Sequence, residues 1–575
     1  MTSSEKIISK NKEFLEKSSP RLYDIFRTRK FWKLEAQGIK GDPDHYYDDD
    51  VAQTLAEEFL DRISVLHLIG DILRSLGGVL GSRPKIDAKK LYEQTFQKIL
   101  YDKKISRHDV ACLTDVSPIG NNSIQPYMNG GPIGENWNTA PGGLYDSISN
   151  SKESIIGIEL GFKADEYGKK VSRLLIQKKR DNPEMYIGLL IDGFVSIVMS
   201  DTNPFDEFKI DTKKMIDEMM DAKIDVRIND SWNPASLDFL AVNHVKLWIF
   251  DGKSAFMGGI GIESQFINTL YDQMDLIKGP FVRTLILISF LLFANQKWNL
   301  VDRGDEIEQI YEMAKNNPEK LDEKFLPELE DTGKITLELS MNVPGYVQDA
   351  QKDYYKLILH DDVREIFIMA PYFSDDKIAR ALVRASKKIE NREAKKQQEL
   401  KKQNNPGISK QDLETFVTEQ LEENKKVHVI FPKKQENVII AEVSKYYAYA
   451  MRKNRIVETK QFVARQGKIE HEMLHAKQMV VVLEKEGKKK YVKFGGSYNP
   501  AGRAHNMWEA NTISYMGKLT DDDSNVKENP IKVYLDTVFY KILEDYSEPF
   551  RWGKTNVKLN PLELFVMWLS KSLFF

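Results

Sequence analysis

The chain has 575 residues, which is too long for one ordinary domain, so two or more domains are expected. Hydrophobic residues make up 41% of the chain and charged residues 29%, a balance typical of a globular protein. The 83 basic and 86 acidic side chains give a formal net charge of -3, which provides no overall basic surface for nucleic acid.

Residues 1–118 show a helical pattern without chemically suggestive residues, and a mostly helical extension is expected there. Its first part, residues 1–30, is polar and charged and does not match a signal peptide, so a cytoplasmic location is expected. Cys112 is the single cysteine, which excludes an intramolecular disulfide. Two apolar stretches, at 63–81 and 285–294, carry charges or are too short to span a membrane, and both are expected to be packed helices.

A passage rich in glycine, proline and asparagine, residues 118–143, is expected to be a domain boundary or a long loop. An alternation of elements follows it, with a strand at 155–162, a helix at 165–179 and a strand at 186–191. The same order returns later, with a strand at 365–370, a helix from residue 375 and a strand at 427–431. The separation of roughly 230 residues is too long for a solenoid repeat, so the pattern indicates a duplicated domain.

The duplication predicts an α/β fold with two similar lobes, each a sheet flanked by helices. The expected boundaries are 119–318 for the first lobe and 319–556 for the second. An insertion in the second lobe, at about residues 390–426, is dense in lysine, glutamate and glutamine. Ser409 and Asp412 form a capping box there, and a helix face follows, formed by Leu413, Phe416, Val417 and Leu421. We expect an exposed, charged helical arm.

The residues suited to chemistry form a motif that occurs once in each lobe. In the first copy, His244 and Lys246 enter a strand at 247–250, which turns at Asp251 and returns to the glycine pair that ends at Gly259. Residues two apart on a strand face the same way, so the imidazole and the ammonium lie on one side. This pair suits a phosphate, because the imidazole can attack phosphorus while the ammonium neutralises its oxygens.

The second copy repeats the spacing on the same frame. His475 and Lys477 enter a strand that includes 479–482, and the chain returns to the glycine pair that ends at Gly496. A single His-x-Lys triplet arises readily by chance. Two copies on matching strand–turn–strand–Gly-Gly frames are strong evidence that the motif has a function.

These motifs resemble the two catalytic motifs of the phospholipase D superfamily, and over about residues 120–550 the arrangement is similar to bacterial cardiolipin synthases. Two further features fit, namely Asp272 before Gly279-Pro280 and Glu509 after Asn506, as does the run Ala370-Pro371-Tyr372-Phe373. The resemblance implies two phospholipase D-like lobes with one histidine from each meeting at a shared phosphate. It also implies a phosphohistidine intermediate and no metal or other cofactor.

The resemblance assigns a role to each residue of the site. His244 becomes the nucleophile, and His475 the general acid that later acts as the base. Asp272 and Glu509 would orient the imidazoles. The remaining residues would bind the phosphoryl oxygens, and these are Lys246, Lys477, Asn499, Ser497, Gly259 and Gly496.

The sequence departs from the family pattern at three places. Val482 replaces the aspartate expected after the second motif, and because the second hairpin is longer, position 482 falls in mid-strand. We therefore infer that Asp251 in the first motif is structural. Gly261 stands where relatives have an asparagine, and Asn506 and Glu509 are separated by two residues instead of one.

One further motif match competes for His475. Residues 471–475 read His-Glu-x-x-His, the zinc-protease pattern, which requires both histidines on one face of a helix. Because His475 opens a run rich in β-favouring residues, a zinc site is not expected.

The leading functional hypothesis is a phospholipid phosphatidyltransferase or phospholipase D, with a lipid alcohol or water as acceptor. A nuclease of the same superfamily is an alternative, although the acidic balance argues against nucleic acid as a partner. A lipid-binding protein without activity is a second alternative, which Gly261 and Val482 keep open. The sequence does not specify the head group, the acceptor or the oligomeric state.

The C-terminal segment at 557–575 is expected to form an amphipathic tail. Trp568 suits a lipid–water interface, and fifteen helical residues reach roughly 22 Å, less than the ~30 Å of a hydrocarbon core. We expect peripheral docking on a membrane surface, with packing onto the protein's own core as the alternative. The face consists of Leu562, Phe565, Val566, Leu569 and Leu573.

Overall fold

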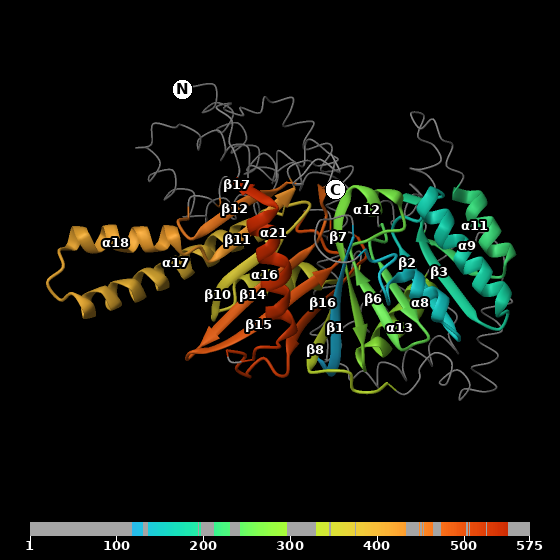
Figure 1. Ribbon diagram of the computed structural model, residues 1–575, viewed down its shortest axis with the longest axis horizontal. Helices are drawn as coiled ribbons and strands as arrows, with labels where there is room; N and C mark the ends of the chain where they lie inside the picture. The colour runs from blue at the N-terminus through green and yellow to red at the C-terminus, as the bar shows by residue number, and fades with distance from the viewer. Residues whose placement is uncertain are drawn as a thin grey trace, which may run out of the picture. The chain divides into compact units, whose positions relative to one another are not determined.

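The computed structural model describes residues 118–129, 136–193, 195–196, 212–229, 242–295, 329–343, 347–373, 375–432, 448, 451, 454–463, 473–501, 504, 507–524 and 526–549. These residues fall within one unit, Leu76–Thr555. The expected N-terminal helices, the apolar stretch at 63–81 and the C-terminal tail lie outside them. Figure 1 shows the arrangement of the elements.

The first lobe is built on a mixed sheet whose described strands follow the order β4-β3-β2-β5-β6-β7-β1. Strands β2, β3 and β4 are parallel, and the others pair in antiparallel fashion. The strands are β1 Ile119–Asn129, β2 Ser154–Glu159, β3 Tyr186–Asp192, β4 Asp225–Asn229, β5 Leu247–Phe250, β6 Ser254–Gly258 and β7 Leu270–Lys278. The helices are α8 Leu144–Asn150, α9 Glu166–Asp181, α11 Thr212–Asp221, α12 Ser264–Asn268 and α13 Phe281–Asn295.

The second lobe repeats this plan in the order β12-β11-β10-β14-β15-β16-β8, again with three parallel strands beside an antiparallel set. The strands are β8 Ile335–Val343, β9 Val347–Gln348, β10 Val363–Met369, β11 Val427–Pro432, β12 Val457–Phe462, β13 Met473–Leu474, β14 Gln478–Lys485, β15 Lys488–Gly496, β16 Glu509–Met516 and β17 Ser547–Pro549. The helices are α16 Asp349–Ile358, α17 Asp376–Asn404, α18 Lys410–Glu423, α20 Pro530–Tyr534, η3 Leu535–Phe539 and α21 Tyr540–Asp545. The predicted α/β fold with two similar lobes is confirmed.

Backbone pairing continues across the boundary between the lobes. Strand β1 pairs with β7 of its own lobe along most of its length and meets β8 at Ile119 and Asn122. The short strand β13 of the second lobe pairs in parallel with β7 of the first. Strand β7 therefore belongs to the first sheet and also receives backbone from the second lobe.

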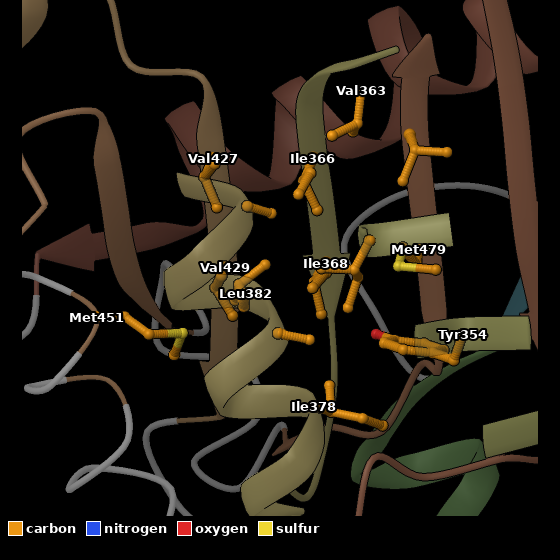
Figure 2. Close-up of a cluster of buried hydrophobic side chains, with 14 of the residues drawn as sticks. Tyr354, Val363, Ile366, Ile368, Ile378, Leu382, Val427, Val429, Met451 and Met479 are labelled. Carbon is orange, nitrogen blue, oxygen red and sulfur yellow. The ribbon is translucent and has the colours of Figure 1, made fainter. Parts of the chain in front are cut away.

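The central strands of the second sheet are apolar on both faces, and helices cover each face. In the second lobe, Ile366 and Ile368 of β10 point to the same face as Val427 and Val429 of β11 and Met479 of β14 (Figure 2). Ile378 and Leu382 of α17 cover them, and all are buried. The same layering in the first lobe seats α9, whose N-terminus is capped by Asp165 accepting a hydrogen bond from the Gly168 amide.

The expectation of a long loop from residue 118 is wrong for its first part, because β1 occupies 119–129. The signal was misleading because the polar residues there serve the sheet. Asn122 is fully buried, and its side chain donates to the carbonyl oxygens of Ile119 and Gly120 and accepts from the Phe281 amide. Composition predicted a loop, whereas pairing with two strands from distant sequence overrides that local preference.

The insertion in the second lobe forms a two-helix hairpin of α17 and α18 (Figure 1). Ser409 caps α18 as predicted, with its hydroxyl accepting from the Asp412 amide at 3.1 Å. Leu413, Val417 and Leu421 are buried against α17, so the charged arm is exposed only on its outer faces. Within the described chain, no helix combines the length and apolar character needed to cross a bilayer.

Candidate active site

The two His-x-Lys motifs occupy equivalent positions in the two lobes. His244 and Lys246 precede β5, and His475 and Lys477 precede β14. All four side chains are buried, with exposures of 8%, 1%, 8% and 3% in that order. Four ionisable groups withdrawn from water in this way require compensating partners.

Each histidine takes its partner carboxylate from the opposite lobe. His244 Nδ1 lies 3.0 Å from Oε2 of Glu509, the first residue of β16. His475 Nδ1 lies 2.6 Å from Oδ2 of Asp272 on β7. Strands β7 and β16 hold equivalent places in the two sheets, so the exchange is reciprocal. Both carboxylates are completely buried.

Backbone hydrogen bonds across the boundary hold both histidines in place. The His244 amide donates to the Trp508 carbonyl at 2.9 Å, and the Trp508 amide donates to the Val242 carbonyl at 3.0 Å. On the other side, the His475 amide donates to the Tyr271 carbonyl at 2.7 Å. The site therefore lies on the seam between the lobes, and neither lobe completes it alone.

Burial and the neighbouring lysines keep both imidazoles neutral. Burial lowers the pKa of His244, and Lys246 lowers it further, together outweighing the opposite effect of Glu509. Burial and the charge of Lys477 lower the pKa of His475 to about 4, despite Asp272. A neutral imidazole that donates through Nδ1 to a carboxylate keeps the lone pair of Nε2 free for chemistry.

Each lysine contacts the backbone of its own motif, and the charge of Lys246 lowers the pKa of Lys477. Lys246 Nζ donates to the carbonyl of His244 at 2.9 Å, and Lys477 Nζ donates to the carbonyl of His475 at 2.7 Å. Burial lowers the pKa of Lys477 to about 8, with Lys246 acting in the same direction against Asp272. Burial also lowers the pKa of Lys246. An anion bound between the two ammonium groups would raise their pKa values again.

Lys477 also approaches the ring of His475. Its Nζ lies 2.7 Å from Nδ1 of that ring and 3.4 Å from Oδ2 of Asp272. Nδ1 of His475 can either donate a proton to Asp272 or accept one from Lys477, but not both. Because a carboxylate is a strong acceptor, we assign the proton to Nδ1, where it forms the hydrogen bond with Asp272. Burial alone would raise the pKa of Asp272, but Lys477 and His475 hold it below its ordinary value.

The residues predicted to contact phosphate lie around these groups. The Ser497 hydroxyl donates to Oε2 of Glu509 and accepts from the Ala510 amide. The side-chain oxygen of Asn499 is buried and has no hydrogen-bond partner among the described residues. A Cβ on Gly259 would lie 2.3 Å from the Asp272 carboxylate, so this glycine makes room for the carboxylate itself.

At Gly496 the backbone sets the requirement. Its φ of 156° is one that other residues rarely adopt, and a Cβ there would lie 2.4 Å from the Ala510 carbonyl oxygen. The glycine therefore allows β15 to pack closely on β16 at the level of Glu509. Contacts of the two glycine pairs with a phosphate remain predictions.

Asp251 is engaged away from the imidazoles. Its carboxylate accepts hydrogen bonds from the backbone amides of Lys152, Glu153 and Ser154 at 2.8–3.0 Å. It also adopts a left-handed φ of 51° in the β5–β6 turn. These contacts support a structural role.

The β14–β15 hairpin of the second lobe is longer and turns at other residues. Val482 lies within β14 opposite Tyr491, and the turn falls later, at Glu486 and Gly487 with φ of 53° and 80°. Both residues take left-handed conformations, as a two-residue hairpin turn requires. An aspartate at 482 would have no turn to support.

Two aromatic rings flank His475, and the sequence did not reveal them. The Phe266 ring packs edge-on at 5.3 Å between centroids, and the Tyr372 ring at 6.0 Å. The run that contains Tyr372 was noted as a family feature, but nothing pointed to Phe266. A Cβ on Gly261 would lie 3.0 Å from the Phe266 ring, so a larger residue there would require the ring to shift.

A buried polar cluster behind His244 was also missed. Asp192 ends β3, accepts from the Asn243 amide at 2.9 Å and accepts from the Asn229 side chain at 2.7 Å. It thereby fixes the residue that precedes His244. The available signal was an aspartate directly after the strand predicted at 186–191.

A second buried carboxyl group lies behind Lys246. Glu159, at the end of β2, accepts from Nε1 of Trp248 at 2.5 Å. Burial raises the pKa of Glu159 well above its ordinary value, against the opposite effects of Trp248 and Lys246. This group belongs to neither motif.

The zinc-protease pattern lacks its helix where the chain is described. Residues 473–474 form β13, and β14 begins three residues after His475. His471, Glu472 and Asn506 lie outside the described residues. Among the residues that are described, no group of three or more His, Cys, Asp or Glu is arranged to hold a metal ion.

Comparison with known proteins yields no matching family model. Curated relatives include cardiolipin synthase of Clostridium perfringens (strain SM101 / Type A), 26% identical over 243 residues, which are 40% of this chain and 44% of the relative. The major cardiolipin synthase ClsA of Bacillus subtilis (strain 168) is 23% identical over 241 residues, 40% of this chain and 44% of the relative. The chain therefore aligns with less than half of the length of these relatives.

Solved structures show weaker likeness. Phosphatidylserine synthase of Haemophilus influenzae Rd KW20 aligns with a TM-score of 0.43 at 13% identity, over 71% of this chain and 84% of that one. Nuc of Salmonella typhimurium, a phospholipase D family member, aligns with a TM-score of 0.23 at 12% identity, over 38% of this chain and 99% of that one.

The duplicated sheet, the paired motifs and the curated relatives agree. Each lobe supplies one His-x-Lys motif and one carboxylate, and the two sets meet at a single buried site. Over about 40% of its length the chain is similar in sequence to bacterial cardiolipin synthases.

Proposed function

We propose that the chain is a phospholipid phosphatidyltransferase or phospholipase D, acting through a phosphohistidine at a membrane surface. The observation that carries this proposal is the reciprocal pairing of two buried, neutral histidines with carboxylates from opposite lobes. Such pairing supplies one nucleophile and one acid–base group to the same phosphorus. The substrate class follows from the relatives, which are cardiolipin synthases.

In the first step, Nε2 of His244 attacks phosphorus and the bond from phosphorus to the leaving alkoxide breaks. That oxygen takes its proton from Nε2 of His475, which must be protonated when substrate is bound. A phosphodiester carries a negative charge, and its presence beside Lys477 raises the proton affinity of His475. Asp272, buried against Nδ1, stabilises the imidazolium.

In the second step, the acceptor oxygen loses its proton to His475 and attacks phosphorus as the bond to His244 breaks. Water gives hydrolysis, and a lipid alcohol gives transfer. Lys246 and Lys477 neutralise the non-bridging oxygens in both steps. Glu509 stabilises the positive charge on the ring of His244 during the lifetime of the intermediate.

The test is incubation of the purified protein with vesicles of phosphatidylglycerol or of phosphatidylcholine, with cardiolipin, phosphatidic acid and free head group resolved. We expect His244→Ala and His475→Ala each to lower turnover by at least about a thousandfold, because one intermediate needs both groups. Circular dichroism checks that both variants fold. Residual activity within about tenfold of wild type in either variant contradicts the mechanism.

A short primary alcohol added to the same assay separates transfer from hydrolysis. The phosphohistidine is open to any acceptor that reaches it, so a phosphatidyl-alcohol product is expected beside phosphatidic acid. Hydrolysis alone at high alcohol concentration would show a water-selective acceptor site and would contradict the synthase-like form of the proposal.

A further inference from the structure

A second buried ion pair crosses the boundary between the lobes. Lys493 Nζ on β15 lies 2.5 Å from Oδ2 of Asp275 on β7, and each side chain is 4% exposed. Removing two charges from water costs several kcal/mol for each ion, and their attraction returns that cost only with good geometry. A buried ion pair is therefore a weak source of stability, so another role is expected for Lys493 and Asp275.

Two neighbouring side chains also contact the pair. The Gln273 side chain donates to Oδ1 of Asp275 at 2.6 Å and accepts from the Tyr534 hydroxyl at 3.0 Å. Lys493 Nζ lies 4.7 Å from the centroid of the Tyr534 ring. We call Gln273, Asp275, Lys493 and Tyr534 the interlobe latch, since the first two belong to the first lobe and the last two to the second.

The latch leads directly to the catalytic groups. The Gln273 amide donates to Oδ1 of Asp272 at 2.8 Å, and the Gln273 carbonyl accepts from the Gly259 amide at 2.9 Å. Asp272 in turn orients His475. A displacement of β7 relative to β15 would therefore move the Asp272 carboxylate, because Gln273 connects the latch to it.

We propose that the interlobe latch fixes the register of the two lobes on which the reciprocal carboxylate exchange depends. Lys493 and Asp275 are positioning residues, because they act on His475 through Gln273 and Asp272. The expected effect on turnover rests on the proposed function. The expected effect on the backbone hydrogen bonds at the seam does not.

The chain offers a matched control on the same strand. Lys490 and Asp523 also form a buried ion pair, at 3.1 Å with exposures of 4% and 2%, but both belong to the second lobe. Lys490→Met leaves one buried carboxylate without its cation, as Lys493→Met does. The two variants therefore differ in whether the lost pair joins the lobes.

The experiment is native-state hydrogen exchange of the full chain, read at the amides that cross the seam. In Lys493→Met we expect these amides to exchange about tenfold faster than in wild type, and in Lys490→Met within about twofold. Tyr534→Phe keeps the ring and loses only the hydrogen bond to Gln273, so we expect a smaller acceleration of amide exchange. This variant replaces Lys493→Met in the test if Lys493→Met folds poorly. The reporters are His244, Met473, His475, Ala476 and Trp508.

Turnover of phosphatidylglycerol supplies the second readout. We expect kcat to fall about tenfold in Lys493→Met with KM within about twofold, since the substrate contacts remain while the catalytic geometry loosens. Equal acceleration of exchange in both lysine variants would overturn the latch. An inactive wild-type protein would overturn the proposed function instead, and the exchange data would still decide the latch.

Discussion

His244 and His475 are neutral in the folded protein, and this makes the free energy of unfolding depend on pH. Burial and the neighbouring lysines lower both pKa values, and for His475 the value falls to about 4. In the unfolded chain a histidine titrates near pH 6.5. Between these values the unfolded state binds more protons than the folded state, so stability rises with pH and is lost on acidification.

For His475, the free energy of unfolding should therefore fall as the pH decreases from about 6.5 toward 4, by at most about 1.4 kcal/mol per pH unit. The lowered pKa of His244 acts in the same direction below pH 6.5. His475→Gln removes one of these groups and should flatten the profile in that window. Denaturant unfolding at a series of pH values measures the slope. Above pH 7 the stability profiles of the wild type and the variant should run parallel. An unchanged slope below pH 6 in the variant would show that the pKa of His475 is not lowered in the folded protein.

At the scale of the elements, the β5–β6 turn shows how the two lobes diverged. Asp251 accepts from three consecutive amides at the start of β2, whereas the second hairpin extends past the equivalent position and turns at Gly487. The motif aspartate is thus tied to the length of one hairpin.

Asp251→Ala should lower the free energy of unfolding by about 1–3 kcal/mol, because the amides of residues 152–154 lose their acceptor. Turnover should stay within about threefold of wild type if the role is structural. Chemical denaturation and the phosphatidylglycerol assay measure the two effects. The converse change, Val482→Asp, should destabilise without gain of activity, since Val482 is 3% exposed in an apolar cluster. A large loss of kcat in Asp251→Ala at unchanged stability would assign it a catalytic role.

Local pattern was sufficient for most of the elements that carry the site. Strands β2, β3, β10 and β11 are runs of β-branched and aliphatic residues bounded by turns, and the sequence placed them within a few residues. Strand β1 was missed because its polar composition is explained only by contacts with β7 and β8, which are distant in sequence.

The residues of the site were identifiable, but their partners were not. Asp272 and Glu509 were assigned to orient imidazoles through the resemblance, whereas the exchange between lobes depends on contacts over 203 and 265 residues. No periodicity reports such contacts. Lys493 and Asp275 had no motif at all, because an ion pair between two strands leaves no mark on local sequence.

At the scale of the whole molecule, attachment to a membrane is expected to depend on the C-terminal tail, which lies outside the described residues. Deletion of residues 561–575 should leave a folded protein that no longer sediments with anionic liposomes, because the apolar face predicted from the sequence would be the anchor. Cosedimentation and thermal unfolding measure the two properties. Aggregation of the truncated protein would show that the tail packs on the core, and unchanged liposome binding would place the anchor elsewhere.

Under the proposed function, the exchange of carboxylates would also set when the chain becomes active during its own synthesis. His244 leaves the ribosome 265 residues before Glu509, its hydrogen-bond partner. At about 5–20 residues per second, this delay is roughly 13–53 s. During that interval the nascent first lobe carries its histidine without the carboxylate that orients it, and until residue 475 is made it also lacks the second histidine. A truncated translation product that ends before residue 475 therefore contains the whole first motif and should leave lipid intact.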